Sequence, residues 1–371
     1  MLAVAEELRR QKPSAKLVYV IGAGDRLADL PREHLAIDTV VSIRAGKFRR
    51  YHGEGWRQLL DISTLLKNLR DAVYVIVGCW QSWRLLGRER PDIIFIKGGF
   101  VGVPLGLAAA VRKVPFITHD SDAVPGLANR IIARWARLHA VALPKENYPY
   151  PTAKTLTVGV PVGKGFAEVS VRQKAAWRKE LGIAEGAPTL LVTGGGNGSV
   201  LLNEAVTSIS AALFEKVPEL HILHITGRKK KAAVQAAYSR DVPSKKSQLI
   251  VEEFVPELYK YSGAADVIVA RAGANTMADF AAQSRACIII PNPLLTNGHQ
   301  LRNAEAMAKG NAVEVIEESV LGADEDALLS AISRLLADPK RRTLLGRRLH
   351  EHSRPDAAKH LAELLIHEAE D

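Results

Sequence analysis

The chain has 371 residues, 47% of them hydrophobic and 24% charged, and its 50 basic and 40 acidic side chains give a net charge of +10. This composition is typical of globular proteins, and the length favours two α/β domains because single hydrophobic cores stop growing at roughly 250–300 residues. No apolar run approaches the roughly 20 residues that span a bilayer, and the charge favours nucleic acid, anionic lipid or phosphorylated substrates as partners without choosing among them.

The chain begins with a predicted amphipathic helix over residues 2–10, without the basic and apolar regions of a signal peptide. The two cysteines, Cys79 and Cys287, lie far apart in apolar runs, which favours buried, reduced thiols. No spacing of cysteine, histidine or acidic residues is typical of a metal site, and no cofactor is expected.

Apolar runs of β-type alternate with helical patterns along the whole chain, which predicts parallel sheets covered by helices. The expected strands are residues 17–21, 72–77, 93–96, 116–118, 189–193, 221–226, 267–269 and 286–291. A segment rich in glycine and proline, 156–166, precedes a polar helix at about 171–181 and is the expected hinge. The predicted domains are therefore 1–162 and 163–352, with a helix at about 353–371 that docks back on the first domain.

Two motifs in the first half follow predicted strands. Gly98 and Gly99 form a strand-to-helix turn, for which packing alone is the simpler explanation. Together with the glycine loop of the second half, however, this turn points to a divided phosphate-binding cleft, in which both glycines are candidates for substrate binding. His119, Asp120 and Asp122 follow the next strand. A buried structural histidine is the usual case, but titratable groups at a strand end favour function, with His119 or Asp120 as proton acceptor.

The second half contains a strand that runs into Gly194-Gly195-Gly196-Asn197-Gly198-Ser199 before a helix. Glycines permit positive φ and remove the Cβ, so several N–H groups can converge on a diphosphate at the helix N-terminus. A tight turn without a ligand is an equally open explanation for a single glycine run.

Two further segments of the second half are predicted to reach the same ligand. A strand leads into Arg271, and the helix that follows carries Asp279, which is either a ribose-binding carboxylate or an ordinary acid near a helix start. A long turn later opens a helix with His299 and Gln300, which can hydrogen-bond a sugar. The motif after the strand comprises Arg271, Gly273, Ala274, Asn275 and Thr276.

These motifs, in order and spacing, resemble the MurG family of lipid II-forming N-acetylglucosaminyltransferases over nearly the whole chain. The resemblance implies a GT-B architecture, with two Rossmann-like domains facing a cleft. It also implies inverting transfer of N-acetylglucosamine from UDP-N-acetylglucosamine to lipid I. By resemblance, Val255 after Phe254 meets the uracil, Asp279 holds the ribose, and His299 and Gln300 hold the sugar. The residues implied at the diphosphate are Gly195, Gly196 and Asn197, and Gly198 of the same loop is a further candidate for substrate binding.

The sequence departs from the family pattern in four places. Gly196 stands where the family usually has serine, Asp279 where it has glutamate, and Gly163 where it has arginine, with Lys164 one place later. Family members also have a strand and a glycine loop with a histidine, the favoured base, before the helix over 2–10. We therefore expect an N-terminal sheet without its first strand, poor transfer by the chain as given, and His119 and Asp120 as the only substitutes for the base.

The expected location is the cytoplasmic face of the membrane, bound peripherally to anionic lipid. The basic and aromatic residues at 44–51 and the aromatic stretch at 80–83 are the candidate contacts, with a solvated basic loop as an equal alternative for the first. Nucleic acid is not expected, because aromatics are not interleaved with the cations. The alternatives are a related GT-B enzyme with another lipid acceptor, or a non-catalytic binder of sugar nucleotides.

Overall fold

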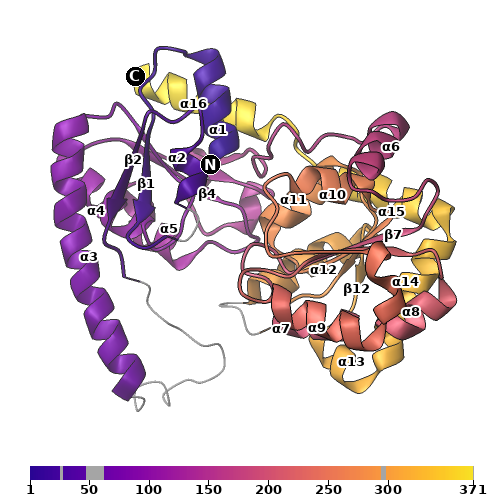
Figure 1. The fold of residues 1–371 in the computed structure, drawn as a ribbon. Helices are drawn as coiled ribbons and strands as arrows, with labels where there is room; N and C mark the ends of the chain where they lie inside the picture. Colours follow the sequence, from indigo (N-terminus) through magenta and orange to yellow (C-terminus); the bar gives the residue numbers. More distant parts are fainter. Residues whose placement is uncertain (26–27, 47–61, 294–297, 371) are drawn as a thin grey trace. The chain divides into compact units, whose positions relative to one another are not determined.

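The structure is a computed structural model that describes all residues except 26–27, 47–61, 294–297 and 371, and the side chains of 62–67, 322–323 and 325. The chain forms two compact α/β units, coloured along the sequence in Figure 1. The first comprises Met1–Gly163, Leu294–His299 and Arg354–Asp371, and the second comprises Lys164–Pro293 and Gln300–Ser353. Within the described part of the chain, no helix is both long and apolar enough to cross a membrane.

The N-terminal unit contains six described strands, all paired in parallel. β1 pairs with β2, and a separate sheet has the order β3-β4-β5-β6. Its main elements are α1 (Leu2–Gln11), β1 (Val18–Gly22), α2 (Asp29–Arg32), β2 (Thr39–Ile43), α3 (Ile62–Glu89), β3 (Ile94–Ile96), α4 (Gly102–Arg112), β4 (Phe116–Asp120), α5 (Leu127–Ile132), β5 (Leu138–Val141), β6 (Thr155–Thr157) and α16 (Ala357–Glu370).

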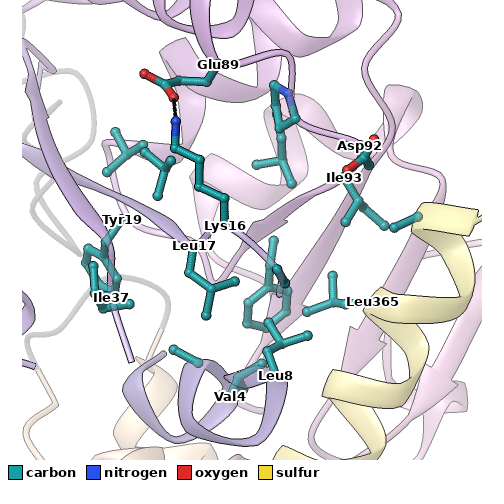
Figure 2. A pocket seen from close by; sticks show the side chains of 18 of the residues that line it. Val4, Leu8, Lys16, Leu17, Tyr19, Ile37, Glu89, Asp92, Ile93 and Leu365 are labelled. Atoms are coloured by element: carbon teal, nitrogen blue, oxygen red, sulfur yellow. Dashed lines mark hydrogen bonds and ion pairs between the residues drawn. The ribbon is translucent and has the colours of Figure 1, made fainter. Parts of the chain in front are cut away.

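A cavity of about 480 Å³ separates the two sheets of this unit, with β1 on one side and β3 on the other. Figure 2 shows apolar side chains such as Leu17, Leu8 and Leu365 around it. The ion pair of Lys16 with Glu89, 2.8 Å between Nζ and Oε2, lies at the ends where β1 and β3 begin. No ladder joins β1 to β3 in the described residues. The described strands of this unit therefore form two separate parallel sheets.

The last helix, α16, packs on α1 at the opposite end of the sequence. Val4 of α1 shares a hydrophobic cluster with Leu361 and Leu365 of α16, and all three side chains are almost completely buried. Nζ of Lys12 also lies 2.6 Å from Oε1 of Glu370. The apolar face at 358, 361 and 365 therefore covers the first helix, as helical spacing allows.

The expectation of a strand at 72–77 is wrong, because these residues lie inside the 28-residue helix α3. The run Val73-Tyr74-Val75-Ile76-Val77 has high strand propensity, but propensity is a weak prior that tertiary packing overrides. In α3, Asp71, Leu85 and Leu86 are buried, so the helix rests on the unit through residues outside that run. The other seven expected strands are confirmed to within two residues at their ends, whereas β2, β5, β6, β9 and β12 are not among the expected strands.

The C-terminal unit has one six-stranded parallel sheet of order β12-β11-β10-β7-β8-β9, covered by helices. Hydrophobic clusters that include strand residues such as Leu190 and Leu191 form its core. The elements are α6 (Val171–Glu180), β7 (Thr189–Thr193), α7 (Val200–Ser208), α8 (Ser210–Lys216), β8 (His221–Ile225), α9 (Lys231–Asp241), β9 (Leu249–Glu252), α10 (Leu258–Ala264), β10 (Val267–Ala270), α11 (Ala274–Ala282), β11 (Cys287–Ile289), α12 (His299–Lys309), β12 (Glu314–Val315), α13 (Glu318–Ala323), α14 (Glu325–Ala337) and α15 (Pro339–His350).

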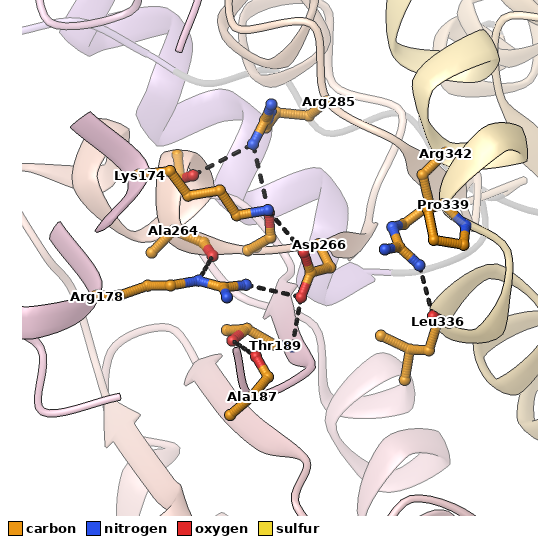
Figure 3. A network of polar contacts seen from close by, with 12 residues as sticks. Lys174, Arg178, Ala187, Thr189, Ala264, Asp266, Arg285, Leu336, Pro339 and Arg342 are labelled. Carbon is orange, nitrogen blue, oxygen red and sulfur yellow. Dashed lines mark hydrogen bonds and ion pairs between the residues drawn. The ribbon is translucent and has the colours of Figure 1, made fainter. Parts of the chain in front are cut away.

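A buried polar network joins α6 to the ends where β7 and β10 begin (Figure 3). The carboxylate of Asp266 lies 2.6 Å from Nζ of Lys174 and 2.7 Å from Nη2 of Arg178, and it accepts the Thr189 N–H at 2.9 Å. Burial alone would raise the pKa of Asp266, but these cations and the N–H outweigh it and hold the pKa below its usual value. Burial lowers the pKa of Lys174 even beside Asp266.

Candidate functional site

The strand order of the C-terminal sheet places most of the predicted donor residues at one edge. Because all six strands are parallel, the turns after β7, β8, β9, β10 and β11 leave the sheet at the same side. The chain continues from β7 to β8 and β9 in one direction and returns to β10 on the other side of β7. The point between β7 and β10 is a topological switch point, where ligands of such sheets bind.

The glycine loop after β7 is tightly folded. Gly195 and Gly198 have φ of 76° and 65°, and the Gly198 N–H donates to the carbonyl of Gly195 at 2.9 Å. Ser199 caps α7 by accepting the Leu202 N–H at 3.3 Å. Gly196 and Asn197 are exposed at the turn of the loop. Such a loop before a helix orients backbone N–H groups toward an anion.

The turn after β8 packs directly against this loop. A Cβ at Gly198 would lie 2.1 Å from the carbonyl oxygen of Thr226, and one at Gly227 would lie 2.4 Å from Cα of Gly198. Asn203 of α7 donates from Nδ2 to the same Thr226 carbonyl at 3.0 Å. The two glycine turns therefore interlock without room for a side chain between them.

A buried histidine, His224, packs behind these two turns. His224 of β8 contacts Oδ1 of Asn203 at 3.1 Å and the Tyr238 hydroxyl at 2.9 Å through its two ring nitrogens. Burial lowers the pKa of His224 to about 3 and raises the pKa of Tyr238. The neutral side chain of His224 thus links β8 to α7 and α9 behind the glycine loop. His224, Asn203 and Tyr238 together hold these three elements in position.

Arg271, which follows β10, is already bonded to protein groups. Its guanidinium donates to Oγ of Ser199 at 2.6 Å from Nη2 and to the Ile290 carbonyl at 3.1 Å from Nη1, and it forms an ion pair with Glu318. Both members of that ion pair have side chains that are at most 13% exposed. The structure therefore favours Arg271 as a support of the glycine loop over Arg271 as a ligand.

The start of α11 lies beside the glycine loop. A Cβ at Gly195 would be 4.0 Å from Oγ1 of Thr276, and one at Gly273 would be 3.8 Å from the same oxygen. Ala274 opens α11 and Asn275 is exposed in its first turn, while Asp279 lies in the second turn, half-buried. The motif after β10 and the glycine loop are thus brought together at the switch point.

The remaining predicted donor residues lie on other turns. Phe254 is half-buried and Val255 buried in the turn after β9, at the same edge of the sheet. Oε1 of Gln300 accepts the Asn292 N–H at 2.9 Å, which holds the start of α12 against the turn after β11. His299 is grouped with the N-terminal unit, and Lys164 is the exposed first residue of the C-terminal unit.

In the N-terminal unit, the turn after β3 and the end of β4 also share an edge. Gly98 and Gly99 have φ of 84° and 80°, and a Cβ at Gly98 would lie 3.5 Å from Nδ2 of Asn129. That same Nδ2 donates to the His119 carbonyl at 2.9 Å. The glycine turn and the segment from His119 to Asp122 are therefore adjacent.

His119 is not placed to take a proton from a substrate. Its side chain is 0% exposed, and its Nε2 contacts the Gly159 carbonyl at 2.9 Å, so Nε2 must carry the proton. Burial lowers the pKa of His119 to about 3. This burial weighs against the expectation that His119 acts as a base, because the strand carries its ring into the interior.

The carboxyl group of Asp120 accepts two hydrogen bonds and has a raised pKa. It accepts the Tyr150 hydroxyl at 2.7 Å and the Gly126 N–H at 3.1 Å, and burial raises the pKa of its carboxyl. A raised pKa strengthens a carboxylate as a proton acceptor. Asp122 is half-buried, and its carbonyl accepts the Tyr148 hydroxyl at 3.0 Å.

Several functional neighbours were missed by sequence reasoning. Ser199 had a signal, because serine before a helix is a typical N-cap. Tyr150, Asn203 and Glu318 had none, because each meets its partner only through the fold. Lys230 stood in a visible basic run, 228–231, that follows a strand and a glycine.

Two α/β units with parallel sheets, one with a glycine loop at its switch point, form the GT-B fold. Solved structures with this fold include MurG of Acinetobacter baumannii, at a TM-score of 0.67 and 23% identity over 99% of this chain and 94% of that chain. The calicheamicin glycosyltransferase CalG4 aligns at a TM-score of 0.61 and 16% identity over 99% and 94%.

Sequence comparison identifies the family to which the chain belongs. Residues 1–141 match the glycosyltransferase family 28 N-terminal domain, and residues 189–361 match the C-terminal domain. A relative from Symbiobacterium thermophilum is 31% identical over 98% of this chain and 91% of its own length, and one from Bacillus licheniformis is 30% identical over 98% and 93%. Both are named UDP-N-acetylglucosamine--N-acetylmuramyl-(pentapeptide) pyrophosphoryl-undecaprenol N-acetylglucosamine transferase. The chain belongs to glycosyltransferase family 28.

Proposed function

We propose that this enzyme transfers N-acetylglucosamine from UDP-N-acetylglucosamine to lipid I, forming lipid II, at the cytoplasmic face of the membrane. The observation that carries the donor assignment is the glycine loop at the switch point, beside the start of α11. The names of the relatives above supply the sugar and the acceptor. In this proposal the C-terminal unit binds the donor, and the N-terminal unit binds the acceptor and the membrane.

The donor site is proposed to use residues of the shared sheet edge. The backbone of 195–198 binds the diphosphate, the turn at Phe254 and Val255 meets the base, and Asp279 accepts the ribose hydroxyls. Asn275, Thr276 and Gln300 lie on turns of the same edge and are proposed to contact the sugar, together with His299. An inverting transfer then needs a base for the acceptor hydroxyl, and Asp120 is the proposed proton acceptor of this chain.

The reaction itself tests the function. The full chain is incubated with UDP-N-acetylglucosamine and either lipid I or a diacylglycerol, and the products are separated by thin-layer chromatography. Sugar transfer to lipid I and none to the diacylglycerol is the expected result, at the low rate that the sequence predicts for this chain. Transfer to the diacylglycerol instead would support a related enzyme with another acceptor, and donor binding without any transfer would support a non-catalytic protein.

Helix α3 carries an exposed apolar stripe that suits a membrane surface. Leu69, Val73, Ile76, Trp80 and Trp83 recur every three or four residues, so they share one face of the helix, and each is between 46% and 70% exposed. Arginines accompany the aromatic rings: Arg84 lies 4.9 Å from the Trp80 ring centre and Arg112 4.2 Å from that of Trp83. The other proposed basic contacts, at 47–51, lie outside the described residues.

A tryptophan and isoleucine face flanked by cations is typical of an interfacial helix bound to anionic lipid. We therefore expect the double variant Ile76→Glu/Trp80→Glu to bind anionic vesicles at least about tenfold more weakly in a sedimentation assay, because burial of each side chain contributes about 1.5–3 kcal/mol. The double variant Val171→Glu/Leu344→Glu adds the same two negative charges at exposed sites on α6 and α15, and it serves as the control. Equal binding by all three proteins would contradict the membrane role of α3.

A further inference from the structure

We propose that Lys230 supplies the positive charge that binds the diphosphate of the donor. This assignment rests on the proposed function of the C-terminal unit. Nζ of Lys230 donates to the carbonyl of Asn197, in the glycine loop, at 2.9 Å, and it lies 3.5 Å from the Arg228 carbonyl. An ammonium has three N–H donors, so at least one remains for a ligand on the loop. Lysine binds phosphate as a point charge in this way in other glycine-loop sites.

The position of Lys230 is determined by rigid neighbours. Its backbone follows Gly227, and its N–H donates to the Gly227 carbonyl at 3.3 Å. Gly227 in turn packs on Gly198 so closely that neither has space for a Cβ. Because the two turns interlock, the half-buried side chain of Lys230 extends across them to the exposed rim of the glycine loop.

The cations near the glycine loop differ in whether a carboxylate balances their charge. The guanidinium of Arg271 donates to Oγ of Ser199 beside the loop, but Glu318 balances its charge. Lys231, the next residue, has its ammonium 2.8 Å from a carboxylate oxygen of Glu252. Among the described residues, Lys230 has no carboxylate partner within ion-pair distance. A cation without a counter-ion, beside a loop that presents N–H groups, creates the potential that a diphosphate would occupy.

Arg228 completes this arrangement. Its guanidinium lies 5.9 Å from the ring centre of Phe254, in the turn proposed to meet the nucleobase. The side chains of the basic run after β8 therefore lie in different places: Arg228 near the base-binding turn, Lys230 at the diphosphate loop and Lys231 beside Glu252. Lys229, the fourth residue of the run, is exposed, and its N–H donates to Oε1 of Glu253 at 2.9 Å. Lys230 and Lys231 are adjacent in sequence, but Lys230 contacts the Asn197 carbonyl and Lys231 pairs with Glu252. Substitutions of these two lysines can therefore be compared directly.

The experiment compares the full chain with Lys230→Gln, Lys230→Arg and Lys231→Gln by calorimetry with UDP and with uridine. Lys230→Gln is expected to weaken UDP binding about 10–100-fold, as expected for the loss of a charge-assisted hydrogen bond, and to leave uridine binding unchanged. Lys230→Arg should retain part of the affinity, and Lys231→Gln should bind UDP as the parent chain does. The KM for UDP-N-acetylglucosamine should rise with Lys230→Gln more than kcat falls.

Ionic strength separates a direct contact from a purely structural role. If Lys230 meets the phosphates, added salt weakens UDP binding by the parent chain more than binding by Lys230→Gln. An equal salt response, or an equal loss in Lys231→Gln, would overturn the assignment of Lys230 while leaving the donor site intact. A parent chain that binds neither UDP nor UDP-N-acetylglucosamine would instead overturn the donor assignment, and this proposal with it. Circular dichroism and the thermal midpoint establish that each variant is folded.

Discussion

Replacing Gly198 by alanine is expected to weaken UDP binding by at least about tenfold. The new Cβ would lie 2.1 Å from the Thr226 carbonyl oxygen, and the residue would keep a φ of 65° that side chains rarely adopt. Strain of this kind costs about 1–3 kcal/mol, and the clash is with backbone, which cannot move aside as a flexible side chain does. The glycine loop must therefore shift away from the turn after β8, and its N–H groups lose their common direction. Calorimetry with UDP measures the loss.

Gly196→Ala is the matched control, two residues earlier in the same loop. Nothing lies within 4 Å of a Cβ at Gly196, and its φ is not positive. We expect UDP binding within about twofold of the parent chain, because neither strain nor a clash arises. If Gly198→Ala bound UDP as well as Gly196→Ala does, the loop geometry would have no part in binding the nucleotide.

Replacing Asp266 by alanine is expected to lower the free energy of unfolding by about 3–5 kcal/mol, which is typical when one partner of a buried ion pair is removed. Its carboxylate is 12% exposed and is the common acceptor of Lys174, Arg178 and the Thr189 N–H. Without it, two cations face each other at the junction of α6 with the sheet. Denaturant unfolding measures the change. Glu252→Ala removes the partner of the more exposed Lys231, at 2.8 Å, and should cost at most about 1 kcal/mol.

The stability contributed by Asp266 also predicts a pH dependence. Its pKa is lowered in the folded chain from the usual 3.8, so the unfolded chain binds the proton first. The contribution is fully present above about pH 4 and is lost as the pH falls through the folded pKa. Acid unfolding of the parent chain should therefore include this loss, whereas Asp266→Asn should show a smaller decrease in stability below pH 4. The same slope in both proteins would remove Asp266 as the cause.

The sequence predicts strand-to-helix motifs well where local geometry requires particular residues. Gly195 and Gly198 have positive φ, and Ser199 caps the following helix, so each of these positions restricts the residue types that fit. The strand at 189–193 was located correctly because its fully buried residues are uniformly apolar or small. By contrast, the prediction of a strand at 72–77 is wrong. The strand propensity of this run is a local property, whereas the helix that contains it is long and packs on the unit through other residues.

The sequence by itself determined the class of fold, the order of the glycine motifs and the family, because these depend on local backbone requirements and on spacing along the chain. The tertiary structure alone decided the burial and the partners of the polar groups around the site. His119 was a candidate base until its strand carried it into the interior, and Arg271 was a candidate ligand until Glu318, from a distant helix, balanced its charge. Lys230 reaches Asn197 only because β7 and β8 are neighbours in the sheet. Burial and pairing across strands set the charge and accessibility of a side chain, and neither is a local property of the sequence.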